Sequence, residues 1–317
     1  MTVVEIIIYI AVGLLMLFAG AEGLIRGSSS LALRVGITPL VVGLTVVAFG
    51  TSSPELVVSL KAALAGNGDI SLGNVIGSNI ANIALILGVA ALIRPLKVQA
   101  VVIRREIPIM IFVTLLLFLF LINNEINRIE GVIFFIGIIV YSFINVVLAK
   151  KEKNKEVEAE FAEGMAKKPL SIWIAIPFII IGLALLVFGA NLFLEASIEV
   201  AKIFGMSQAV IGLTIVAIGT SLPELATSAV ASLKNESDIA IGNVVGSNIF
   251  NILLILGITA MIIPVSAADI TLIDIVVMSV TAVIVLPMTW TKFVLNRVEG
   301  FFLLIGYFVY MYYLLPK

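Results

Sequence analysis

Two glutamates, Glu55 and Glu224, each follow a proline in the middle of an apolar run. The first lies in Gly-Thr-Ser-Ser-Pro-Glu-Leu, which begins at Gly50, and the second in Gly-Thr-Ser-Leu-Pro-Glu-Leu, which begins at Gly219. An ionisable side chain at membrane depth is costly, so it normally faces a bundle interior or a water-filled cavity and marks an ion path. The chain contains no histidine and no cysteine, so any cation must be held by oxygen atoms.

Each proline predicts a break in its helix. Pro54 has no N–H group and clashes with the preceding turn, so we expect nearby carbonyls, including that of Ala48, to lack an internal partner. Thr51 and Ser52 add hydroxyl oxygens beside this break. The second motif offers the same groups at Ala217, Thr220 and Ser221. Two carboxylates surrounded by neutral oxygens indicate a site for a hard cation.

A second polar segment follows each glutamate motif. Asn74, Ser78 and Asn82 are spaced four residues apart, which places them on one face of a helix. Their counterparts are Asn243, Ser247 and Asn251. These residues also suit a purely structural role, because small residues permit close helix approach and asparagines hydrogen-bond between helices.

The charge of the two glutamates bears on the choice of cation. Two carboxylates neutralise one Ca²⁺, which prefers six to eight oxygen ligands at about 2.3–2.6 Å. Mg²⁺ fits less well because it demands a tighter octahedral geometry and dehydrates reluctantly. Ca²⁺ and Na⁺, which have similar radii, are therefore the favoured ions.

The composition identifies an integral membrane protein. Hydrophobic residues make up 61% of the 317 positions, charged residues only 12%, and the mean hydropathy is +1.23. About 20 apolar residues cross a hydrocarbon core of about 30 Å. Ten such segments are predicted, at residues 3–32, 38–64, 70–93, 106–122, 130–148, 170–203, 208–233, 239–262, 270–288 and 299–315.

The two halves of the chain repeat each other at a displacement of 169 positions. Over residues 43–88 and 212–257, 29 of the 46 aligned residues are identical. Because five helices per copy is an odd number, the second copy must enter the membrane from the opposite face. We therefore expect an all-α fold of ten transmembrane helices as two inverted five-helix repeats. The expected division is residues 1–148, a cytoplasmic linker at 149–169, and residues 170–317.

The basic residues predict the orientation. With the N-terminus outside, only four of the 19 basic residues lie outside, namely Lys61, Arg128, Lys202 and Lys317. Cytoplasmic loops carry an excess of Lys and Arg, so both termini are expected outside. The first apolar run is too long for a signal peptide and has no basic region before it, so we expect it to remain as a membrane helix.

The paired motifs with Gly-Ser-Asn-Ile at residues 77–80 and 246–249 resemble the two repeats of the cation/Ca²⁺ exchanger superfamily, most closely its prokaryotic sodium/calcium exchangers. The resemblance covers all ten predicted helices. It implies a first and sixth helix that slide against an eight-helix core, in a multi-pass protein of a prokaryotic plasma membrane. It also implies exchange of one Ca²⁺ for about three Na⁺, which moves one net charge per cycle, worth about 2.3 kcal/mol per 100 mV.

The resemblance also implies a set of ion ligands. Its acidic positions fall on Glu55 and Glu224, its hydroxyls on Thr51, Ser52, Ser78, Thr220, Ser221 and Ser247, its carbonyls on Ala48 and Ala217, and its amides on Asn82 and Asn251. Asn251 stands where some members, including the potassium-dependent branch, have Asp.

Other functions remain open at this level. A cation/proton exchanger of the same fold would use the two glutamates to carry protons, although that branch typically has different motifs and often histidine. An intramembrane protease ranks lower, because the repeat offers neither a nucleophile with a base nor an aspartate pair. A passive channel, which would give uncoupled flux, also ranks lower. We expect a monomer in the lipid bilayer that moves Ca²⁺ and Na⁺, with no enzymatic activity, no resident cofactor and no nucleic-acid partner.

Overall fold

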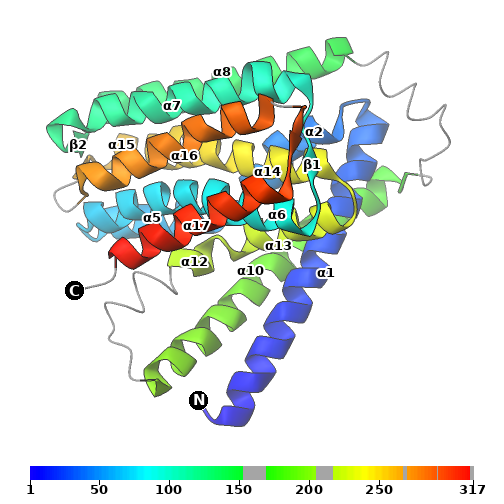
Figure 1. The fold of residues 1–317 in the computed structure, drawn as a ribbon, viewed down its shortest axis with the longest axis horizontal. Helices are drawn as coiled ribbons and strands as arrows, with labels where there is room; N and C mark the ends of the chain where they lie inside the picture. Colours follow the sequence, from blue (N-terminus) through cyan, green and yellow to red (C-terminus); the bar gives the residue numbers. More distant parts are fainter. Residues whose placement is uncertain (153–168, 205–216, 267–269, 291, 315–317) are drawn as a thin grey trace.

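The computed structural model describes residues 1–152, 169–204, 217–266, 270–290 and 292–314. Figure 1 shows two long helices, α1 and α10, lying side by side and projecting from a packed group of the other helices. Most of the predicted linker and the first part of the predicted segment 208–233 lie outside the described residues.

The helices of the first half follow the predicted segments closely. They are α1 (Val3–Val35), α2 (Pro39–Val42), α3 (Ala48–Thr51), α4 (Ser53–Leu64), α5 (Gly68–Ile80), α6 (Gly88–Ile93), α7 (Ile107–Phe120) and α8 (Arg128–Glu152). Three π-helical segments, η1 (Gly43–Val47), η2 (Ala81–Leu87) and η3 (Val102–Glu106), and a 3₁₀ turn, η4 (Leu121–Asn123), join them.

The second half repeats this order. Its helices are α10 (Ile172–Ile203), α12 (Ala217–Thr220), α13 (Leu222–Leu233), α14 (Ser237–Phe250), α15 (Gly257–Ile262), α16 (Leu272–Trp290) and α17 (Arg297–Leu314), with a π-helical segment η6 (Asn251–Leu256). Seven helical segments of the described chain are individually long and apolar enough to span a membrane, and a bent pair, 39–51 with 53–64, makes up to eight.

Two pairs of short strands join the halves at their connections. Strand β1 (Leu96–Lys97) pairs antiparallel with β4 (Val294–Leu295), and β2 (Glu125–Ile126) pairs antiparallel with β3 (Val265–Ser266). Each pair therefore holds a connection of one half against a connection of the other.

Helices α1 and α10 pack at very close range. A Cβ atom added at Gly20 would lie 2.8 Å from the carbonyl oxygen of Gly182, and one added at Gly13 would lie 2.9 Å from that of Gly189. Such small residues let two backbones touch, which is the usual way that helices associate within a membrane.

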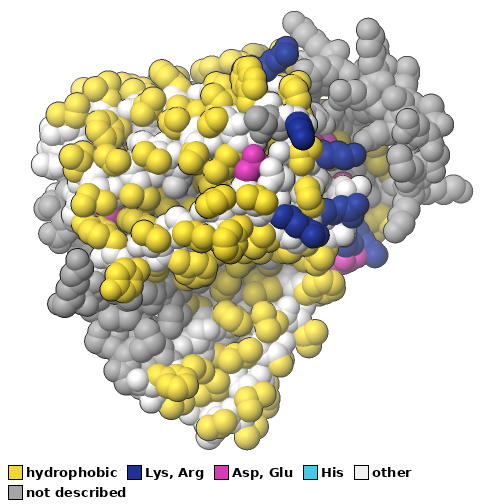
Figure 2. All heavy atoms as spheres, in the orientation of Figure 1, with side chains coloured by type: hydrophobic (Ala, Val, Ile, Leu, Met, Phe, Trp, Pro, Cys, Tyr) yellow, Lys and Arg dark blue, Asp and Glu magenta, His cyan; other side chains and the backbone are white. Residues whose placement is uncertain are grey.

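The polar segments of the sequence lie at the centre of the bundle. The spans 68–93 and 237–262 are each 78% buried, whereas the other candidate spans are between 22% and 39% buried. Figure 2 shows hydrophobic side chains covering the sides of the helices on the visible face, with Lys and Arg side chains gathered towards one end. The structure is thus an all-helical, multi-span membrane protein whose two central helices carry the asparagines and serines.

Candidate cation site

The two glutamates lie in the first turns of helices that begin directly after a break. Helix α3 ends at Thr51 and α4 begins at Ser53, while Ser52 between them has φ −83° and ψ 3°. Ser221 occupies the same place between α12 and α13, with φ −89° and ψ 8°. The prolines stand within the first turns of α4 and α13, where a missing N–H is tolerated. The predicted break is confirmed, with a bend of 43° in the first half.

One reason given for the carbonyl ligands is wrong. The carbonyl oxygen of Ala48 was expected to lack an internal partner, but it accepts a hydrogen bond from the Ser52 N–H at 3.0 Å. The hydroxyl oxygen of Thr51 also lies 3.4 Å from it. The proline bends the helix without freeing the Ala48 carbonyl. In a regular α-helix, the N–H that Pro54 lacks would have bonded to the carbonyl of Gly50, four residues earlier.

Both glutamate side chains are buried, and most of their oxygens have no partner. Glu55 and Glu224 are each 1% exposed. The hydroxyl of Ser52 donates to Oε1 of Glu224 at 3.0 Å, whereas Oε2 of Glu224 and both carboxyl oxygens of Glu55 have no hydrogen-bond partner. Within the described residues, no lysine or arginine forms an ion pair with either. A buried charge without a partner is strongly unfavourable, so these carboxyl groups are stable only when they are protonated or when a cation lies beside them.

Neutral oxygens from the central helices surround this region. Ser78, Asn82, Ser247 and Asn251 are at most 2% exposed. The hydroxyl of Ser221 donates to the Ser78 hydroxyl at 3.3 Å, which joins the second break to the central helix of the first half. Oδ1 of Asn82, Oδ1 of Asn251 and Oγ of Ser247 have no hydrogen-bond partner and are therefore able to accept a cation.

The amide groups are held by the neighbouring asparagines. Nδ2 of Asn82 donates to Oδ1 of Asn248 at 3.1 Å, and Nδ2 of Asn251 donates to Oδ1 of Asn79 at 3.4 Å. These bonds use the donor side of each amide and leave the oxygen side available. Asn82 and Asn251 lie in η2 and η6, and π-helical turns within α-helices are frequent at functional sites.

The packing crosses between the halves. Helix α13 packs against η2, and α4 packs against η6, so each glutamate helix meets the amide segment of the other half. The structure brings together the predicted acids, serines and asparagines; Thr220 is half-buried, and the Ala217 side chain lies outside the described residues. No cluster of three or more Asp, Glu, His or Cys residues occurs in the described parts of the chain, so two carboxylates supply the acidic groups of this site.

The comparison with known proteins identifies the family. The profile of the sodium/calcium exchanger protein family matches residues 5–147 and 174–315. The chain belongs to this family. The resemblance in the paired motifs is therefore confirmed.

Two relatives and one solved structure show how far the likeness extends. The sodium/calcium exchanger MaX1 of Methanosarcina acetivorans is 34% identical over 340 residues, covering 94% of this chain and 95% of MaX1. The inner membrane protein YrbG of Escherichia coli is 39% identical over 255 residues, covering 80% of this chain and 78% of YrbG. The sodium-calcium exchanger NCX_Mj, soaked with Na⁺ and Ca²⁺, matches with a TM-score of 0.84 at 29% identity, covering 100% of both chains.

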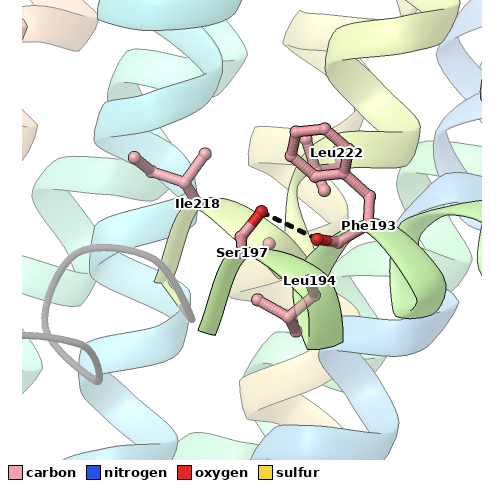
Figure 3. A pocket seen from close by; sticks show the side chains of 6 residues that line it. Phe193, Leu194, Ser197, Ile218 and Leu222 are labelled. Atoms are coloured by element: carbon pink, nitrogen blue, oxygen red, sulfur yellow. Dashed lines mark hydrogen bonds between the residues drawn. The ribbon is translucent and has the colours of Figure 1, made fainter. Parts of the chain in front are cut away.

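In this family member, one pocket opens beside the second break. It has a volume of about 180 Å³ and lies between α10 and the α12–α13 break (Figure 3). Its lining is mostly apolar and consists of Phe193, Leu194, Ser197, Ile218, Gly219 and Leu222. The Ser197 hydroxyl donates to the Phe193 carbonyl of its own helix at 2.7 Å. Gly219 and Leu222 flank Thr220 and Ser221, so the pocket lies next to the second break.

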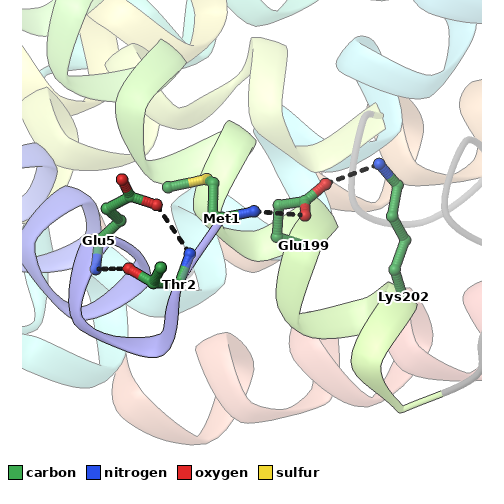
Figure 4. A network of polar contacts seen from close by, with 5 residues as sticks. All are labelled: Met1, Thr2, Glu5, Glu199 and Lys202. Atoms are coloured by element: carbon green, nitrogen blue, oxygen red, sulfur yellow. Dashed lines mark hydrogen bonds and ion pairs between the residues drawn. The ribbon is translucent and has the colours of Figure 1, made fainter.

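Two polar networks involve α1, one in its second half and one at its N-terminus. Glu22 and Arg26, four residues apart on α1, form an ion pair with an Nε–Oε1 distance of 2.6 Å. Lys234, directly after α13, also pairs with Glu22, a contact that the sequence does not reveal. At the other end of α1, the Met1 amino group lies 3.3 Å from Glu199 of α10, which also pairs with Lys202 (Figure 4).

Proposed function

We propose that the protein is a secondary active antiporter that exchanges Na⁺ for Ca²⁺ across the membrane. The observation that carries this proposal is the pair of buried glutamates, whose carboxyl oxygens lack basic partners and are surrounded by neutral oxygens. Family membership and the sodium/calcium exchangers among the similar proteins support the same cargo. Ca²⁺ and Na⁺ are the transported substrates in this proposal.

The proposed ligands are those expected from the sequence. Glu55 and Glu224 serve both cargoes, and the neutral ligands are Thr51, Thr220, Ser52, Ser221, Ser78, Ser247, Ala48, Ala217, Asn82 and Asn251. Competition couples the two ions, because the same two carboxylates cannot hold both cargoes fully. Empty carboxylates in the bundle centre are too costly for the bare carrier to cross easily. With about three Na⁺ per Ca²⁺ the cycle moves one charge, and a negative interior favours Ca²⁺ export.

We propose ten membrane helices as two inverted repeats, residues 1–148 and 170–317, with both termini outside. Two sets of contacts support this arrangement. The β1–β4 pair joins two connections that the proposal places inside, and the β2–β3 pair joins two that it places outside. The side-chain bond from Gln99 to Asp238, at 2.7 Å, also links two proposed inside connections. The gathering of basic side chains towards one end agrees with the positive-inside rule.

The proposed setting is the plasma membrane of a prokaryote, where the protein works as a monomer without enzymatic activity, a resident cofactor or a nucleic-acid partner. Two observations support it. The apolar flanks of the bundle suit a lipid environment, and the similar YrbG is an inner membrane protein. Each half contributes one glutamate to the site within a single chain, so a second copy is not needed to complete it.

The test is Ca²⁺ uptake into liposomes that contain the purified protein, are loaded with Na⁺ and are diluted into Na⁺-free buffer. We expect uptake that requires the Na⁺ gradient and is lost in Glu55→Gln and in Glu224→Gln. Glu199→Gln is the matched control, because it removes the same charge from the surface network of Lys202 instead of the bundle centre.

The same liposomes separate the alternatives. Uptake driven equally by a pH gradient without Na⁺ would assign the protein to proton-coupled exchange. Flux that needs no counter-ion would indicate a channel. Uptake that survives in both glutamine variants would contradict the proposed ligands.

A further inference from the structure

Asn74 and Asn243 form a second set of contacts around the site, outside the proposed ligands. Nδ2 of Asn243 donates to the backbone carbonyl of Glu224 at 3.3 Å and to the Ser228 hydroxyl at 2.9 Å. Its Oδ1 accepts a hydrogen bond from the hydroxyl of Thr51 at 3.0 Å. Asn243 therefore touches the glutamate helix of its own half and the threonine of the other half.

The same pattern occurs around Asn74. Its Nδ2 donates to the carbonyl of Glu55 at 3.3 Å and to the Ser59 hydroxyl at 2.9 Å. Its Oδ1 accepts from the hydroxyl of Thr220 at 3.4 Å. The two asparagines thus make equivalent contacts in opposite directions across the molecule.

The chemistry of these contacts fixes the direction of the threonine hydroxyl. A backbone carbonyl only accepts hydrogen bonds, so the Asn243 group that faces the Glu224 carbonyl must be the NH₂ group. The Oδ1 atom then faces Thr51, and the Thr51 hydroxyl must donate its single proton. Its other near neighbours, the carbonyls of Val47 and Ala48 and the carboxylate of Glu224, are also acceptors. The lone pairs of the Thr51 oxygen are left for a cation.

We propose that Asn74 and Asn243 are positioning residues for the threonine hydroxyls, Asn243 for Thr51 and Asn74 for Thr220. Each asparagine accepts the proton of the threonine hydroxyl in the opposite half, so that the lone pairs of the hydroxyl oxygen face the transported cation. This inference rests on the proposed function and deepens it. Each asparagine also fixes the backbone at the glutamate of its own half. Through these contacts, one asparagine side chain fixes both the backbone position of the glutamate in its own half and the orientation of the threonine hydroxyl in the other half.

A purely structural role makes a different prediction. An asparagine that only joins helices stabilises the protein whether or not a cation binds, and its removal lowers the unfolding temperature without changing affinity. A positioning residue acts through its threonine. The losses of Ca²⁺ affinity caused by removing the asparagine and by removing the threonine hydroxyl must therefore not add up in the double variant.

The test measures Ca²⁺ affinity from the rise in unfolding temperature of the purified full-length protein as Ca²⁺ is titrated. The variants are Asn243→Ala, Thr51→Val and the double variant. The control is Thr289→Val, which removes a buried hydroxyl that donates to its own helix in α16. The midpoint of thermal unfolding in ion-free buffer measures the stability of each variant, and the Ca²⁺ titration measures the affinity of its cation site.

We expect each single variant to weaken Ca²⁺ binding about tenfold and the double variant to be no weaker than either single variant. The control should stay within about twofold of the wild-type affinity. An Asn243→Ala protein with a lower midpoint but wild-type affinity would overturn the proposal, and so would effects that multiply in the double variant. If Asn243→Ala does not fold, the same comparison of two single variants and their double variant can be made with Asn74→Ala and Thr220→Val, and the same outcomes would support or overturn the proposal. A wild-type protein that binds no Ca²⁺ would overturn the proposed function itself, a distinct result.

Discussion

The two halves have nearly the same motifs but different surroundings. Leu24 and Ser28 of α1 are completely buried, and helix α1 packs along α13. Their counterparts in α10, Phe193 and Ser197, line the pocket beside the second break, and α10 makes no comparable contact with α4 within the described chain. Closely similar sequences therefore pack tightly in one half and leave a pocket in the other, a difference that is consistent with the proposed antiport.

One ion pair is present in only one of the two halves. Glu22 of α1 pairs with Lys234 at the end of α13, and this contact lies on the tightly packed side. The equivalent positions in the other half are Asn191 and Ala65, which cannot form an ion pair. We name the Glu22–Lys234 pair the latch. We expect it to favour the arrangement in which α1 packs along α13.

The largest expected effect comes from the two glutamates themselves. Replacing either by Gln removes half of the negative charge available to a divalent ion, so Ca²⁺ uptake should fall at least about a hundredfold in both variants. The measurement is initial uptake into Na⁺-loaded liposomes. A variant of either half that retains uptake would show that the halves do not share the cargo.

The same variants sharpen the comparison when stability is measured. Glu224 accepts one hydrogen bond from Ser52, whereas neither oxygen of Glu55 has a partner. In ion-free buffer, Glu55→Gln should therefore raise the unfolding midpoint more than Glu224→Gln, by about 2 °C or more. An unchanged midpoint would mean that Glu55 is already neutral without a cation.

A smaller difference is expected between the two asparagines. The Asn243–Thr51 bond is 3.0 Å long and joins two fully buried side chains, while the Asn74–Thr220 bond is 3.4 Å long and half-buried. Asn243→Ala should therefore weaken Ca²⁺ binding about tenfold and Asn74→Ala only about threefold. Calcium titrations of unfolding temperature measure both. Equal losses would indicate that the two bonds become equivalent when the ion binds.

Particular residues show what the sequence could and could not predict. The glutamates, the proline breaks and the central asparagines were predictable because each follows from local chemistry: a charge in an apolar run, a missing N–H, a spacing of four. The partner of Ala48, the Asn243–Thr51 bond and the Glu22–Lys234 contact were not, because they depend on how segments far apart in the chain approach. The two-residue strands were missed for the same reason.

The asymmetry between the halves was also unpredictable, for a different reason. A repeat with nearly equal sequences has two near-equivalent arrangements that differ by exchanging the roles of the halves. Local pattern cannot choose between them. We expect long-range differences such as Lys234 against Ala65 to bias that choice, and this one is recognisable only once the fold brings Glu22 beside Lys234.

Breaking the latch should change the balance between the two arrangements modestly. Lys234→Met removes a partly exposed ion pair, and such pairs contribute little, so we expect an increase of about threefold in the labelling rate of a Ser28→Cys probe. The sequence contains no cysteine, so the probe is the only thiol. Lys202→Met is the control, because Lys202 and its partner Glu199 both belong to α10. Equal labelling in both variants would contradict the latch.

The smallest effect, and the most direct test of the comparison, is to build the missing latch. Asn191→Glu with Ala65→Lys gives the second half the ion pair that the first half has. The new pair forms only when α10 closes against α4, so it must compete with the existing latch, and its effect should be about twofold. A Leu194→Cys probe in the pocket should then be labelled about half as fast, and adding Lys234→Met should slow it further. If labelling does not change in either background, charge at these positions does not set the balance, and the asymmetry must come from the apolar contacts of α1 with α13.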